Sequence, residues 1–138
     1  MKITNYNLIK MINTLEGYVD KKLPQKISYA ITCNFMEISK KYNTYDTQLK
    51  KIFNLYSEHI HKDKNGNIEV SSNGTPIVDE DVKSEFDEQI TDLLNIEINV
   101  DMYYIEKNVF NYEDKGIYDA LSANDIMILQ SILCKSES

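Results

Sequence analysis

The sequence predicts an α+β protein that is mostly helical, with one long helix packed with two or three shorter helices and a small antiparallel β-hairpin or sheet. Two patterns predict this class. Apolar residues recur at helical spacing in four segments, and alternating apolar residues beside Asn-Gly pairs indicate short strands. The length of 138 residues suits a single domain, residues 1–138.

The first part of the chain predicts two helices. Residues 5–20 carry apolar side chains at helical spacing, and Thr4 can cap their first turn. Pro24 then begins a long helix over residues 25–60. Its apolar stripe alternates steps of four and three, as a coiled-coil seam does, and consists of Ile31, Phe35, Ile38, Tyr42, Tyr45, Leu49, Ile52 and Tyr56. We expect this stripe to pack inside the chain, and the alternative is that it forms the seam of a homodimer.

Residues 59–70, HIHKDKNGNIEV, raise the question of a metal site. A calcium loop beginning at Asp63 would need Gly at its sixth position and Glu at its twelfth, where Ile68 and Gly74 stand, so calcium is excluded. The weaker alternative is a zinc site, because His59, His61 and Asp63 would share one face of a strand.

The same region contains two Asn-Gly pairs, at residues 65–66 and 73–74. Asn and Gly tolerate a positive φ, and such pairs are a strong signal for a hairpin turn. We therefore expect a protruding hairpin over residues 60–78, with no metal.

The second half predicts an acidic helix, a strand region and a final helix. Residues 79–95 place apolar side chains on one face and Glu85, Asp87, Glu88 and Asp92 on the other. Asp79 is expected to cap this helix and Asp81 to lie in its first turn, and both are further candidates for partner binding. The apolar period changes to two near Ile96, so residues 96–112 are expected to be a strand region. Ser122 and Asp125 form a capping box for a helix over residues 122–134.

The charge of the chain opposes direct binding to nucleic acid. The net charge is −7 and no arginine is present, so the guanidinium forks that read phosphate and guanine are missing. Residues 1–62 sum to +5 and residues 63–138 to −12. The acidic half either neutralises the basic half or leaves an acidic face for a basic partner.

No sequence pattern supports catalysis, a cofactor or a membrane span. Nucleophile elbows, phosphate loops and zinc-protease motifs are missing from the sequence, so we expect no enzyme and no cofactor. No apolar run is long enough to cross a bilayer, and the N-terminus is a poor signal peptide. Cys33 and Cys134 lie in apolar segments and are expected to be buried thiols of a cytoplasmic protein.

Three patches of the sequence resemble a family of short, uncharacterised proteins of phages and prophages of low-GC Gram-positive bacteria. The patches are KLPQKISYAITCN at 22–34, LLNIEINVDM at 93–102 and LSANDIMILQSIL at 121–133. Their order matches as well, and only residues 60–78 look like a variable insert. The resemblance implies a viral origin and the cytoplasm of an infected bacterium, and it transfers no functional residue.

These observations favour a non-enzymatic protein-binding module. We expect an inhibitor of a host defence or nucleic-acid-processing enzyme, which it would engage through the acidic helix in imitation of a phosphate row. The alternative is an accessory protein of the virion or its assembly that oligomerises through the heptad stripe. The expected partner is a host protein, without direct contact to nucleic acid or membrane.

Overall fold

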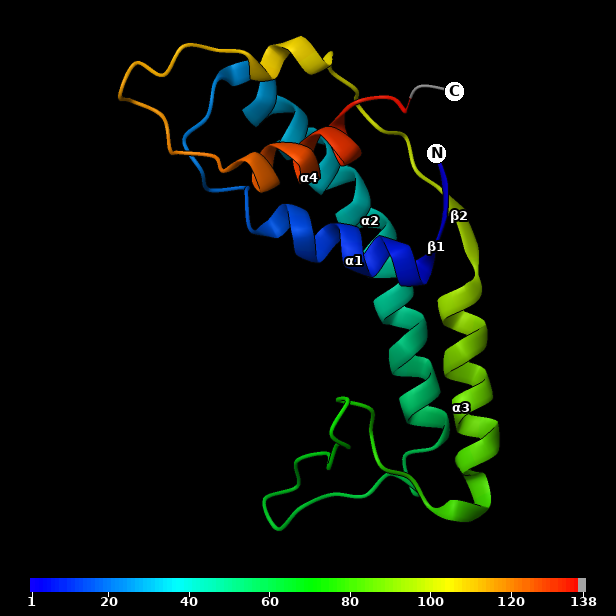
Figure 1. Cartoon of the computed structure of the whole chain (residues 1–138). Coiled ribbons are helices and arrows are strands. Elements are labelled where there is room, and N and C mark those ends of the chain that lie inside the picture. The colour runs from blue at the N-terminus through cyan, green and yellow to red at the C-terminus, as the bar shows by residue number, and fades with distance from the viewer. Residues whose placement is uncertain (137–138) are drawn as a thin grey trace. The chain divides into compact units, whose positions relative to one another are not determined.

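The predicted fold class is confirmed by the computed structural model, which describes residues 1–136. Four α-helices, two short strands and one 3-10 helix follow one another along this part of the chain (Figure 1). In chain order they are β1 Lys2–Thr4, α1 Asn5–Glu16, α2 Gln25–Leu55, α3 Glu80–Asn95, β2 Glu97–Asn99, η1 Lys107–Phe110 and α4 Ala123–Leu133.

The chain divides into two compact units, each with its own hydrophobic cluster. The first unit comprises Met1–Tyr42 and the chain from Glu97 onward, and the second comprises Asn43–Ile96. Because α2 runs from Gln25 to Leu55, it supplies residues to both units.

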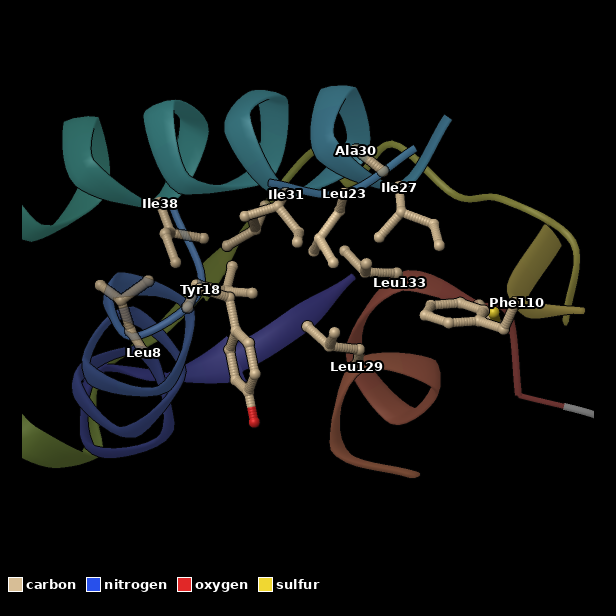
Figure 2. Packing of buried hydrophobic residues seen from close by; sticks show 13 residues of the cluster. Leu8, Tyr18, Leu23, Ile27, Ala30, Ile31, Ile38, Phe110, Leu129 and Leu133 are labelled. Atoms are coloured by element: carbon tan, nitrogen blue, oxygen red, sulfur yellow. The ribbon is translucent and has the colours of Figure 1, made fainter. Parts of the chain in front are cut away.

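The core of the first unit joins α1, the N-terminal half of α2, and α4. Figure 2 shows side chains from these three helices converging, among them Leu8, Ile31, Ile38 and Leu129, all of which are at most 1% exposed. Phe110 of η1 also belongs to this cluster. Burying this apolar surface is the main stabilising contribution in the unit.

Helix caps follow the sequence signals at two places. The hydroxyl of Thr4 accepts a hydrogen bond from the backbone N–H of Asn7, and Ser122 and Asp125 form the predicted capping box. α1 ends at Glu16, earlier than the predicted residue 20, because the chain tightens into turns from Gly17, a poor helix former.

The strands of the first unit pair antiparallel, with Ile3 opposite Ile98. The amino group of Met1 donates to the carbonyl of Val100 at 2.8 Å, and the Val100 N–H donates back to Met1. β1 is three residues long and was not expected, because so short a segment shows no period in the sequence.

The strand region predicted at residues 96–112 is a strand only over β2, and the prediction is wrong at Lys107–Phe110, which form the 3-10 helix η1. Beyond β2, the buried amide of Asn34 accepts from the N–H of Tyr103 at 2.7 Å and donates to the carbonyl of the same residue at 2.9 Å. A side chain thus takes the place that a neighbouring strand would fill. The N–H of Ile105 then bonds to the carbonyl of Leu133.

The core of the second unit is smaller and aromatic. Phe86 of α3 is fully buried and contacts the ring of Tyr56 edge-on and the ring of Phe53 face-on. Ile60 and Val78 complete the cluster from either side of the segment between α2 and α3.

That segment is held by a closed ring of three backbone hydrogen bonds. His61 N–H donates to Ile77, Ile77 N–H donates to Glu69, and Glu69 N–H donates to His61, each at 2.9 Å. The three residues are eight apart. Three antiparallel bridges join Ile60 to Val78, Lys62 to Ile68 and Val70 to Pro76, so the region predicted as a hairpin consists of three short paired segments. α2 consequently stops at Leu55 and not at residue 60, because Ile60 pairs with Val78.

Equivalent turns connect the three bridged segments. Each turn ends in an Asn-Gly pair, and Gly66 and Gly74 have φ of +81° and +84°. Their N–H groups donate to Asp63 and Ser71, again eight residues apart. The Asn-Gly signal therefore predicted both turns correctly.

Candidate functional site

The exposed face of α3 carries a stripe of four carboxylates within the second unit. Asp81, Glu85, Glu88 and Asp92 are all exposed and follow one another at steps of four, three and four residues. Such steps place side chains on one side of a helix. At ~1.5 Å per residue the stripe is about 16 Å long. Among the described residues, no salt bridge involves any of these four side chains.

The other two acidic residues predicted for this face are paired with basic groups. Asp87 is half-buried and lies 2.6 Å from the ammonium of Lys83, one helical turn away. This contact raises the pKa of Lys83. Asp79 accepts from the imidazoles of His59 and His61. Four of the six predicted carboxylates are therefore exposed without an ion pair among the described residues, whereas Asp79 and Asp87 are half-buried and paired.

An apolar groove of about 360 Å³ lies beside this acidic stripe. It runs between the C-terminal end of α2 and α3, and Asp92 belongs both to its wall and to the stripe. Leu55 and Ile96 line it and are 71% and 50% exposed. Lys51 lies on the α2 side. The groove was not predicted, because Ile96 was assigned to a strand and Leu55 to the interior of a longer helix.

No protein-family model, curated protein or solved structure matches this chain. The arrangement of the residues themselves is therefore the basis for a functional proposal.

The heptad stripe of α2 is largely covered within its own chain. Ile31 and Ile38 are core residues of the first unit, and Tyr56 is a core residue of the second. Phe35 and Tyr42 pack on the first core, and Ile52 packs on the second. Tyr45 is buried and Leu49 is half-buried. The face predicted as a homodimer seam thus has little surface left for a second copy.

The two histidines of the alternative zinc site lie beside a different carboxylate from the one considered there. His61 Nε2 is 2.8 Å from Asp79 Oδ1, and His59 Nδ1 is 3.2 Å from Asp79 Oδ2. Asp63 instead accepts from the backbone N–H groups of Asn65 and Asn67 in the first turn. The two imidazoles share one face because the segment is extended, as the alternation predicted.

Asp79 is the residue that joins these imidazoles to α3. It occupies the N-cap position, yet its side chain makes no capping hydrogen bond. Hydrogen bonds from His61 and then from His59 hold the pKa of its carboxyl below the ordinary value. This role was missed because Asp79 is 18 residues from His61 and has the sequence signature of a helix cap.

The two cysteines are free thiols, with Cys134 buried and Cys33 half-buried. Burial raises the pKa of the Cys134 thiol, which makes it a weak nucleophile. Within residues 1–136, no helix has the length and apolar character needed to cross a bilayer.

Proposed function

We propose that this chain is a non-enzymatic protein-binding module that docks through the α3 stripe and the adjoining groove. The partner would be a defence or nucleic-acid-processing enzyme of a bacterial host, and binding would inhibit it. The observation that carries the proposal is the placement of four exposed carboxylates, at Asp81, Glu85, Glu88 and Asp92, beside an exposed apolar groove.

The stripe has the chemistry of a ligand for lysine and arginine side chains. Its neighbouring charges are separated by about 5 to 6 Å along the helix axis, at ~1.5 Å per residue. Phosphates along one strand of duplex DNA are ~3.4 Å apart along its axis. The carboxylates are thus spaced more widely than phosphates, but they carry the same sign of charge, so a basic surface that neutralises phosphates would also attract this row.

The groove supplies an apolar contact surface, which the charged stripe alone does not offer. Exposed ion pairs contribute little affinity, whereas apolar side chains seated in a pocket dominate most interfaces. Leu55 and Ile96 would surround an apolar side chain of the partner, and the stripe would steer and orient the complex. An interface of this kind has an apolar centre and a charged rim.

The test is affinity capture from the lysate of a low-GC Gram-positive bacterium, followed by an activity assay on the captured enzyme. We expect the wild-type chain to retain one enzyme at low salt, to release it at high salt and to inhibit it. The quadruple variant D81N/E85Q/E88Q/D92N should lose the partner and the inhibition.

A matched control removes four exposed carboxylates elsewhere, in E16Q/D20N/D101N/E113Q. It changes the net charge by the same amount and should keep the partner.

Leu55→Asp should weaken binding even at low salt, because it places a charge in the apolar groove. Binding that survives loss of the stripe, or that the control variant also loses, contradicts the proposed surface.

A further inference from the structure

A cluster of metal-ligating side chains lies where the segment before α3 meets its first turn. One ligand atom from each of His59, Asp79 and Asp81 lies within 4.8 Å of the other two. His59 and Asp79 are half-buried, and Asp81 is exposed. The cluster combines an imidazole with two carboxylates, which distinguishes it from a chance grouping of acidic residues on a helix.

Backbone contacts bring the residues that carry these side chains close together. Asp79 N–H donates to the carbonyl of His59 at 3.0 Å, beside the bridge between Ile60 and Val78. That pairing holds the His59 and Asp79 backbones together. α3 begins at Glu80, so its first turn presents Asp81 two residues beyond Asp79. All of these contacts lie inside the second unit.

The donor set suits a first-row divalent ion such as zinc. Imidazole nitrogen and carboxylate oxygen bind Zn²⁺ at about 2.0–2.2 Å, and three protein ligands leave a position for water. The 3.2 Å between His59 Nδ1 and Asp79 Oδ2 matches the separation of two ligands that share one tetrahedral ion. Small rotations of Asp81 would bring the third oxygen to the same ion.

His61 is placed to orient Asp79 through a hydrogen bond, as carboxylates that ligate metals ordinarily are oriented. Its Nε2 lies 2.8 Å from Asp79 Oδ1, the oxygen that does not face His59. Donation from His61 to this oxygen would leave Oδ2 oriented toward the ion. Hydrogen bonds of this outer kind orient metal ligands, and their loss typically weakens binding ~10–100-fold.

We propose that His59, Asp79 and Asp81 form a zinc-binding site and that His61 orients Asp79 within it. The ion would link the end of the segment after α2 to the start of α3. Binding to the folded state alone would then raise the melting temperature of the protein. The site shares Asp81 with the docking surface proposed above, while His59 and Asp79 lie outside that surface.

The experiment is a competition titration of the purified, metal-free chain with Zn²⁺ against a chromogenic chelator. Substitution with Co²⁺ provides a second readout, because visible absorption reports ligand number and geometry. We expect one Zn²⁺ per chain and a rise in melting temperature. H59Q and D81N should each lose at least about tenfold in affinity, and H61Q should change it in the same direction.

Asp92→Asn is the matched control, because it removes a carboxylate from the same helix outside the cluster. It should bind Zn²⁺ like the wild type. D81N removes an exposed side chain and should leave the fold intact, which circular dichroism would verify. A wild-type chain without zinc affinity, or a D81N variant with unchanged affinity, would overturn the site without bearing on the docking surface, which Leu55→Asp probes.

Discussion

Asn34 shows how one side chain can replace an element of secondary structure. It is fully buried on α2, and its amide forms two hydrogen bonds with the backbone of Tyr103. Buried polar groups must be paired, and the chain beyond β2 has no strand beside it at this point to provide the pairing. One amide therefore fixes where the extended chain passes over the helix.

Replacing Asn34 with alanine should destabilise the first unit by roughly 1–2 kcal/mol, because two hydrogen bonds between a fully buried amide and the half-covered Tyr103 backbone would be lost. Urea unfolding measured by circular dichroism would give this difference.

Asn43→Ala is the control for Asn34, since Asn43 is exposed on the same helix. We expect a change within about 0.5 kcal/mol for this surface site. Equal losses from the two substitutions would mean that the Tyr103 hydrogen bonds contribute nothing beyond helix propensity.

Among the elements, the turns between α2 and α3 depend on backbone conformation more than on packing. Gly66 and Gly74 lie in the left-handed region, and a Cβ atom built at either would meet nothing within 4 Å. The constraint at these sites is therefore purely conformational.

Gly66→Ala and Gly74→Ala should each destabilise the second unit by about 1–2 kcal/mol, the penalty for an L-residue in this region. Thermal unfolding of the variants would measure the effect.

Gly17→Ala provides the contrast, because Gly17 has a helical φ of −68° at the end of α1. It should be neutral or slightly stabilising. If Gly17→Ala destabilised the protein as much as Gly66→Ala, the backbone φ would not be what limits substitution at these positions.

Sequence predictability also differs from element to element. The helices were predictable because each buries a stripe with a period near 3.6 over at least 11 residues. β1 was not, because Lys2–Thr4 becomes a strand only through its pairing with Glu97–Asn99. The ring through His61, Glu69 and Ile77 was missed for the same reason, since its equivalent positions carry unlike side chains.

The candidate sites were likewise predictable only where they depend on residues close together in the sequence. The acidic face of α3 was predictable because it depends on neighbours along one helix. The pairing of Asp79 with His59 and His61, and the groove beside Leu55, were not, because each depends on residues distant in sequence.

For the molecule as a whole, the presence of two hydrophobic clusters suggests two levels of stability. The first cluster contains 13 buried residues and the second only Tyr56, Ile60, Val78 and Phe86. Regions with few buried apolar contacts open at lower free energy than well-packed ones. The second unit should therefore open more readily.

Phe86→Leu, which should cost about 1 kcal/mol, is expected to speed hydrogen exchange in α3 and leave the slowest amides of α4 unchanged. Exchange measured by mass spectrometry on peptides would resolve the two helices. Leu129→Ala, in the first cluster, should instead speed exchange in α4. If either variant sped hydrogen exchange equally in α3 and α4, the two units would open together as a single cooperative unit.

The eight-residue step between α2 and α3 has a consequence for how this segment can vary in evolution. Each step contributes one member to the hydrogen-bonded ring and one glycine turn. Insertions or deletions of one whole step would keep the turn pattern and the side-chain alternation, with one ring member more or fewer. Odd-length changes would shift the side-chain alternation, and even-length changes other than multiples of eight would displace the glycine turns from the ring. In relatives of this chain, the segment between Ile60 and Val78 would then vary in length by multiples of eight residues, while the Ile60–Val78 bridge stays in place.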